Sequence, residues 1–292
     1  MGRRKRTIGE KAIELFIMAN GALAIAVILL IFVFLLRDGL PVFKTTSLKA
    51  FLTGRNWYPV PDEIFGALPL ILGSLWITAG AIVVALPIGV ACANYLAEVA
   101  PPSVREILKP TVEVLAGIPL VVIGFIGLVV LAPYIKELFH LNTGLTALTG
   151  AIMLGFMAMP TIISISEDAI VAVPREYRDA SLALGATKWQ TISEVVVPAA
   201  KSGIVAAVML GIGRAVGETM TVLMVTGNAA VIPHTLLEPV RTMTATIAAE
   251  MGEVVQGSPH YHALFAIGIV LFIITFLINL AADIALRRSA HR

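Results

Sequence analysis

The chain has 292 residues, of which 58% are apolar and only 14% are Asp, Glu, Lys or Arg, and its formal net charge is +2. Soluble domains average roughly 45–50% apolar and about 25% charged residues, so this composition leaves too little polar surface for a water-soluble fold. A disordered chain is excluded as well, because disorder requires low hydrophobicity. The mean hydropathy of +0.92 predicts a polytopic membrane protein.

Six segments are long and apolar enough to cross, as helices, a hydrocarbon core about 30 Å thick. They are residues 15–36, 68–95, 112–133, 145–166, 204–225 and 263–286. We therefore expect an all-α membrane protein with six transmembrane helices. Its expected parts are a basic arm (1–14), a first helix (15–36), an extracytoplasmic loop (37–67), a five-helix core (68–286) with an inner loop (167–203) and an outer loop (226–262), and a tail (287–292).

The distribution of lysine and arginine predicts the orientation. With the N-terminus in the cytoplasm, 14 of the 21 cations fall on the inner side and 6 on the outer side, and Arg214 lies within a span. Inner loops carry an excess of Lys and Arg, so we expect a multi-pass protein of the cytoplasmic membrane with both termini inside. Contact with anionic lipid headgroups is the simplest role for the basic arm, which holds Arg3, Arg4, Lys5, Arg6 and Lys11.

The inner loop predicts two short helices joined by a turn at Gly185. Pro174 suits a helix start, where its missing N–H is not needed, and the hydroxyl of Thr187 can cap the second helix. An amphipathic connector on the membrane surface has the same pattern, so periodicity alone leaves a connector and a docking element equally open.

The spacing within this loop resembles the "EAA" loop of ABC importer permeases, which reads Glu-Ala-Ala, three residues, Gly, nine residues, Ile-x-Leu-Pro. Here the corresponding positions are Asp179-Ala180-Ser181, Gly185 and Val195-x-Val197-Pro198. The resemblance implies a coupling helix, formed with Asp179, Ala180, Ser181, Gly185 and Pro198, that docks on an ATP-hydrolysing subunit. No G-x-x-x-x-G-K-[ST] phosphate loop occurs in the 292 residues, so we expect partner subunits to bind ATP and Mg, and this chain to be a permease without enzyme activity, cofactor or metal.

The fifth predicted span contains a cation, Arg214, whose insertion at the bilayer centre costs roughly 2.5–3.5 kcal/mol. Glu218 lies four residues later, so on one continuous helix the two side chains can pair. One interpretation is a neutralised pair that only holds helices together. The other is that Arg214 stabilises a passing oxyanion with its planar fork of donors, while Glu218 fixes its rotamer and accepts a hydrogen bond from hydrogen phosphate.

Small and hydroxylated residues surround this pair. Gly213 and Gly217 form a face on which a neighbouring helix or the substrate can approach the backbone closely. Thr219 and Thr221 supply hydroxyls to the predicted substrate pathway.

Three runs, at residues 213–220, 112–119 and 160–168, resemble the phosphate-specific ABC importer permeases. The basic start, residues 36–41 and residues 248–253 are more similar to the PstC subunits of that family than to their PstA partners. The resemblance covers nearly the whole chain and implies a type I ABC importer permease fold and import of inorganic phosphate. It also implies a complex with a PstA-like permease, a PstB-like ATPase dimer and an extracytoplasmic phosphate-binding protein, in the lipid bilayer and without nucleic acid.

Other functions remain open at this point. Molybdate, tungstate and sulfate are also tetrahedral oxyanions, so a permease for one of them has the same requirements. An integral-membrane enzyme acting on a lipid-linked phosphate is less well supported, because the spans contain no nucleophile–base pair or metal cluster. A channel or secondary transporter does not explain the docking loop. Co-purification of an ATPase distinguishes an importer from these alternatives.

Overall fold

The computed structural model describes the backbone of residues 8–290 and the side chains of residues 13–281, 283 and 284. The cations of the predicted basic arm (Arg3, Arg4, Lys5, Arg6, Lys11) and tail (Arg287, Arg288, Arg292) lie outside the described side chains. The described chain is mostly helical, with one two-stranded antiparallel sheet, which confirms the predicted all-α class.

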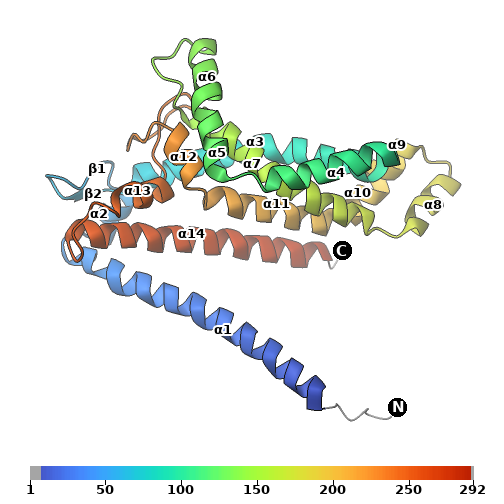
Figure 1. The fold of residues 1–292 in the computed structure, drawn as a ribbon, viewed down its shortest axis with the longest axis horizontal. Coiled ribbons are helices and arrows are strands. Elements are labelled where there is room, and N and C mark those ends of the chain that lie inside the picture. Colours follow the sequence, from blue (N-terminus) through green and yellow to red (C-terminus); the bar gives the residue numbers. More distant parts are fainter. Residues whose placement is uncertain (1–7, 291–292) are drawn as a thin grey trace.

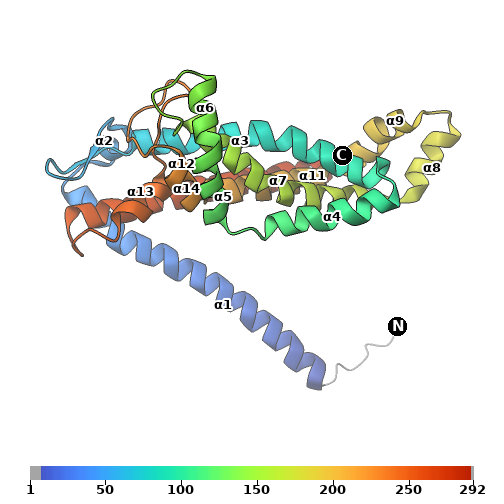
Figure 2. The same cartoon turned by 45° about the horizontal axis from the view of Figure 1, so that its top comes forward.

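Four long helices run side by side along one axis and form the bundle: α3 (Leu68–Asn94), α7 (Ala147–Val171), α11 (Lys201–Val216) and α14 (Pro259–Ala290) (Figure 1). The helix α1 (Ile8–Gly39) packs on α14 only through its second half, where Phe32 contacts Phe272 with ring centroids 4.9 Å apart. Its first half diverges from the bundle in both views (Figure 1, Figure 2). The bundle is therefore centred on α3, α7 and α11, and α1 is peripheral.

Small residues allow α3 and α7 to pack closely. A Cβ added at Gly89 would lie 2.9 Å from Ile162, and one at Gly155 would lie 3.2 Å from the carbonyl of Ala81. Membrane helices associate through such small-residue contacts, because lipid provides no hydrophobic force between them. Pro87 lies within α3, which continues through it.

The two ends of the bundle carry different segments. We call the end with residues 174–198 the loop end, and the opposite one the distal end (Figure 1). The loop end holds the π-helix η2 (Tyr95–Val99), α4 (Pro102–Ala116), α8 (Arg175–Ala183), α9 (Lys188–Gln190), the π-helix η4 (Thr191–Val196) and α10 (Val197–Ala199). The distal end holds η1 (Leu40–Lys44), α2 (Leu48–Thr53), β1 (Trp57–Tyr58), β2 (Ile64–Phe65) and α13 (Met243–Glu250).

The two predicted outer loops pack together into one unit at the distal end. Phe51 and Trp57 of the first loop share a buried core with Met243 of the second and Leu264 of α14. Glu250 joins the segments through polar contacts: it accepts hydrogen bonds from Arg241 (2.6 Å) and from the indole N–H of Trp57 (3.1 Å), and it contacts His260 Nε2 at 2.8 Å. The distal segments are thus an ordered part of the fold.

Five described helical segments are long and apolar enough to span a membrane, namely Ile13–Lys44, Leu68–Val99, Leu120–Leu138, Ala147–Val171 and Pro259–Ala281. A sixth is reached if the bent pair Lys188–Ala199 and Lys201–Val216, which meet at 68°, is counted as one span. The range of five to six agrees with the six predicted.

The third predicted span, residues 112–133, is wrong as one helix. The helix α4 ends at Ala116, and a new helix starts at Leu120 with Pro119 as its N-cap. Proline lacks an N–H and disfavours the helical conformation of the residue before it, so Ile118–Pro119 ends the first helix. The apolar span consists instead of α5 (Leu120–Ile126), the π-helix η3 (Gly127–Leu131) and α6 (Ala132–Leu138), which cross the long axis of the bundle steeply in both views (Figure 1, Figure 2).

The fifth predicted span, residues 204–225, is also broken. The helix α11 ends at Val216, and α12 (Met220–Val225) follows after Gly217, Glu218 and Thr219. The amides of Gly217 and Glu218 bond the carbonyls of Gly213 and Ala215, at 3.3 Å each, in a tightened last turn, and Thr219 leaves the helical conformation with φ −121°. This break lies within the segment that contains Arg214 and Glu218, so it decides how the two side chains are placed.

Candidate functional site

The predicted docking loop forms the two short helices that its sequence indicates. Gly185 has φ +87°, its N–H bonds the carbonyl of Leu182, and the N–H of Ala186 bonds that of Ser181, which is the hydrogen-bond pattern of a glycine-ended helix. Thr187 caps the second helix in a capping box with Gln190. The predicted glycine turn and threonine cap are confirmed.

The loop presents apolar side chains to its surroundings. Leu184 is 90% exposed, Trp189 72% and Tyr177 54%, and no side chain of α8 is buried. Asp179 and Ala180 are exposed on α8, Pro198 is exposed on α10, and no atom lies within 4 Å of a Cβ added at Gly185. Exposed large apolar groups beside a tight turn are typical of a surface that is covered by a partner.

The second half of the loop is anchored in the bundle. Val196 is fully buried in a cluster with Ala93 of α3 and Ile170 of α7. The hydroxyl of Ser181 lies 3.0 Å from that of Thr191, so α8 is also attached to η4. The loop therefore has one exposed apolar side and one side that contacts the ends of α3 and α7.

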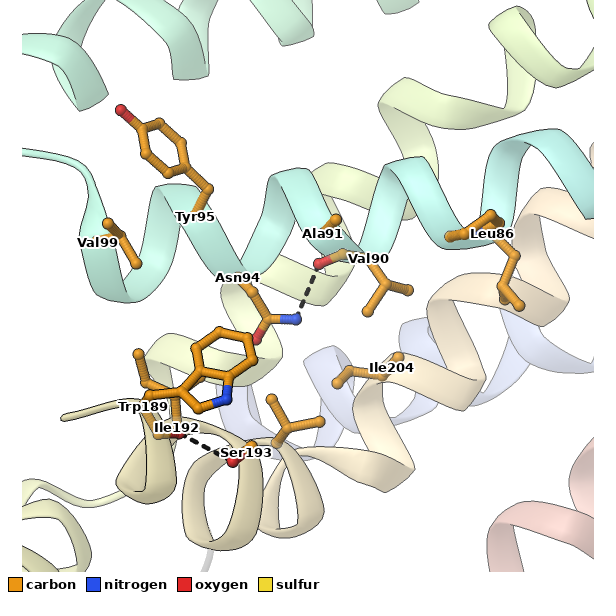
Figure 3. Close-up of a pocket in the computed structure, with 12 residues that line it drawn as sticks. Leu86, Val90, Ala91, Asn94, Tyr95, Val99, Trp189, Ile192, Ser193 and Ile204 are labelled. Carbon is orange, nitrogen blue, oxygen red and sulfur yellow. Dashed lines mark hydrogen bonds between the residues drawn. The ribbon is translucent and has the colours of Figure 1, made fainter. Parts of the chain in front are cut away.

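An apolar groove of about 760 Å³ separates this loop from α3. In Figure 3, Trp189 and Ile192 lie on one wall, with Val90 and Val99 on the helix opposite. Asn94 donates a hydrogen bond to the carbonyl of Val90 (2.9 Å), and its side-chain oxygen has no hydrogen-bond partner among the described residues. None of the lining residues is charged, so the groove lacks the groups that hold an anion.

Arg214 lies half-buried on α11 and donates a hydrogen bond to the hydroxyl of Thr161 on α7, at 3.2 Å. Among the described side chains, no carboxylate forms an ion pair with it. Cations within a membrane protein normally pair with an acidic group or line a polar pathway. The guanidinium thus retains donors for which the described part of the chain supplies no acceptor.

The predicted Arg214–Glu218 pair is wrong, because the helix does not continue to Glu218. The Glu218 side chain is 5% exposed, and its carboxylate accepts a hydrogen bond from the N–H of Thr221 (3.0 Å) at the start of α12. The hydroxyl of Thr244 donates to the carbonyl of Glu218 at 2.7 Å. Glu218 thus stabilises the break in the helix, and it does not fix the rotamer of Arg214.

The remaining predicted pathway residues are placed differently from one another. Thr221 is fully buried, and its hydroxyl lies 3.1 Å from the carbonyl of Leu120, so a solute cannot reach it in this conformation. Thr219 is half-buried and donates to the carbonyl of Gly217 at 3.2 Å. A Cβ at Gly213 would meet no atom within 4 Å, so none of the described residues packs against this position.

Acidic residues at the end of α7 join it to α4. Glu167 is 1% exposed and forms ion pairs with Arg105 and with Lys109 (2.6 Å), and Lys109 also contacts Asp168 at 3.0 Å. The hydrogen bond to Glu167 raises the pKa of Lys109 above its usual range, so this lysine stays charged at neutral pH. Sequence reasoning did not identify Thr161 as the hydrogen-bond partner of Arg214. Thr161 and Glu167 both lie in residues 160–168, one of the runs on which the resemblance to phosphate permeases rests.

The described residues contain no group of three or more His, Cys, Asp or Glu that could hold a metal ion. The structure instead has two other candidate features. One is the exposed apolar surface of the loop end, and the other is Arg214 inside the bundle, whose guanidinium has donors without an acceptor among the described residues. The first suits docking and the second suits an anion.

Residues 85–292 match the family model of the binding-protein-dependent transport system inner membrane component. The chain is 40% identical over 278 residues, which are 94% of this chain and 90% of the relative, to a probable ABC transporter permease protein, YqgH, of Bacillus subtilis. It is 39% identical over 262 residues, 83% of this chain and 80% of the relative, to the phosphate transport system permease protein PstC of Mesorhizobium japonicum.

Solved structures of ABC transporters share the fold. A chain of a bacterial alginate ABC transporter, in complex with a pentasaccharide-bound periplasmic protein, gives a TM-score of 0.64 at 17% identity, covering 97% of this chain and 98% of that one. A chain of the MetNI methionine ABC transporter in an inward-facing conformation gives 0.56 at 21% identity, covering 77% and 94%.

Proposed function

Because the chain belongs to the family of binding-protein-dependent inner membrane transport components, we propose that it is the PstC-like permease subunit of an ATP-driven importer of inorganic phosphate. In this proposal it forms half of the translocation pathway and lies in the cytoplasmic membrane with both termini inside. The observation that carries the proposal is the half-buried Arg214, whose described polar partner is the neutral Thr161. A guanidinium without a counter-charge is a suitable site for an oxyanion that passes between subunits.

Phosphate is the anion that the relatives support. Several curated relatives named as phosphate transport system permeases are 33–39% identical to this chain over most of its length. Glu218 supports the same choice if a conformational change brings its carboxylate to the anion, because hydrogen phosphate can donate a hydrogen bond to it and sulfate cannot.

The partners follow from the family and from the loop. We propose a second, PstA-like permease beside the open face at Gly213, and a PstB-like ATPase dimer on Tyr177, Leu184 and Trp189. An extracytoplasmic phosphate-binding protein would dock at the distal end. ATP and Mg would be bound by the ATPase subunits, and the permease would have no catalytic residues of its own.

Uptake by cells tests this proposal. The chain is co-expressed with a PstA-like permease, a PstB-like ATPase and a phosphate-binding protein in a strain that lacks phosphate importers. Uptake of radiolabelled phosphate is then measured with an excess of unlabelled phosphate, sulfate or molybdate. We expect uptake that requires ATP and is inhibited by phosphate alone. Inhibition by sulfate or molybdate, with little by phosphate, would assign a different oxyanion, and uptake independent of the ATPase would contradict the proposal.

A further inference from the structure

The helix α8 contacts the rest of the chain through one narrow face. Its side chains are all exposed except those of Arg178 and Ser181, which are half-buried. These two residues are three positions apart and therefore lie on the same side of the helix. Ser181 contacts η4, which belongs to the same loop, at Thr191. Arg178 is thus the side chain of α8 that reaches the long helices of the bundle.

The guanidinium of Arg178 joins three elements. Its Nε donates to Glu98 of η2 at 3.0 Å, and Nη2 donates to the same carboxylate and to the carbonyl of Ile170 (2.9 Å) at the end of α7. Its Nη1 donates to the carbonyl of Val173 at 2.6 Å and lies 3.4 Å from that of Pro174. All three guanidinium nitrogens are therefore used: Arg178 ties α8 to the end of the α3 span, to the end of α7 and to the residues that link α7 to α8.

The ion pair between Arg178 and Glu98, which we call the joint, is largely shielded from water, because the side chain of Arg178 is 19% exposed and that of Glu98 is 11% exposed. Ion pairs that are shielded in this way are screened little by salt, and the bidentate fork of arginine fixes direction as well as distance. Lysine carries the same charge without the planar fork, so it cannot hold the carboxylate and the helix-end carbonyls together.

We propose that Arg178, held by Glu98, is the positioning residue that transmits movement of the docked helix α8 to the spans α3 and α7. The inference rests on the proposed function as an ATP-driven importer, but not on which oxyanion is carried. A displacement of α8 by the ATPase would move the ends of both spans together, because one rigid side chain is bonded to both. Without this joint, α8 would follow the ATPase while the spans moved less.

Two conservative variants of the assembled importer test this role. Arg178→Lys keeps the charge and removes the fork, whereas Glu98→Gln removes the charge from the span and leaves the docking loop unaltered. The matched control is Arg175→Lys on the same helix, since Arg175 is exposed and makes no polar contact with any described residue. The measurement is the number of anions imported per ATP hydrolysed in proteoliposomes, together with the amount of ATPase that co-purifies.

We expect both variants to retain the ATPase and its hydrolysis while import per ATP falls about tenfold, the order expected for loss of one charge-assisted hydrogen bond. The double variant should be no worse than Arg178→Lys alone, because both changes weaken the same charged contact. Arg175→Lys should match the wild type.

Two results would overturn the inference: a wild-type ratio of import to hydrolysis in Glu98→Gln, or loss of the ATPase from the Glu98→Gln complex, which would make the contact a support of the docking surface only. The proposed function fails in a different way, since in that case the wild-type complex itself imports no oxyanion in response to ATP.

Discussion

Two helices in this chain end at a glycine, Gly185 or Gly217, but only one of these positions needs glycine for its backbone conformation. At the loop end, Gly185 has φ +87° and open space around its Cα, so glycine is needed for the backbone conformation and not for packing. In the broken span, Gly217 has φ −83°, which any residue can adopt, and a Cβ there would meet only the carbonyls of its own helix, from 3.6 Å. The first turn is therefore fixed by its own sequence, whereas the second break depends on the contacts of Glu218 and Thr219.

This difference explains which predictions succeeded. The docking loop was predictable because its signals are local: Gly185 for the turn and Thr187 for the cap act within a few residues. The break at residues 217–219 was not, because Glu218 is stabilised by Thr221 and by Thr244, which lies 26 residues away in the sequence. The sequence-based prediction assumed one continuous helix, in which residues four positions apart lie on the same face, and it therefore placed Glu218 beside Arg214.

Gly185→Val gives the largest effect that this comparison predicts. A β-branched residue at φ +87° is strained by on the order of 1–3 kcal/mol, so we expect the turn to rearrange and phosphate uptake to fall about tenfold or more while ATP hydrolysis continues. Gly257→Val is the matched control, because Gly257 has φ +80° and open space but belongs to the distal end. Normal coupled uptake in Gly185→Val would refute the docking role of the turn.

Gly213→Val and Gly211→Val separate contacts within the chain from contacts with a partner. A Cβ at Gly211 would lie 2.8 Å from Ile162, so Gly211→Val should destabilise the isolated chain by about 1–3 kcal/mol in thermal unfolding. Gly213→Val should leave the unfolding of the isolated chain unchanged, because the added group meets open space. We expect it to reduce co-purification of the second permease, and full assembly would show that this face packs on nothing.

Glu218→Gln and Glu218→Ala give the smallest effect and test the broken span. The amide oxygen of glutamine can still accept from the N–H of Thr221, whereas alanine removes this contact and should cost about 1 kcal/mol in thermal unfolding. Equal stability of the two variants would contradict the capping role. A shift of preference from phosphate towards sulfate in Glu218→Gln, measured by competition, would add a role in substrate selection.

The overall architecture was largely accessible from composition, since long apolar segments at residues 68–95, 145–166 and 263–286 correspond to α3, α7 and α14. What sequence alone did not give are the contacts between elements far apart in the chain. Arg214 meets Thr161 across 53 positions, and Arg178 meets Glu98 across 80. Such pairs depend on how α3, α7 and α11 pack, which no local pattern encodes.

The most direct test of the account is uptake of phosphate by Arg214→Gln and Arg214→Lys in the complete importer. Glutamine is polar but carries no charge, so we predict that uptake falls about tenfold to a hundredfold, the range for loss of a charged hydrogen bond, with the complex and its ATPase intact. Lysine should retain part of the uptake, because it keeps the charge without the fork. Undiminished uptake by an assembled Arg214→Gln importer would contradict the central claim that this guanidinium stabilises the passing anion.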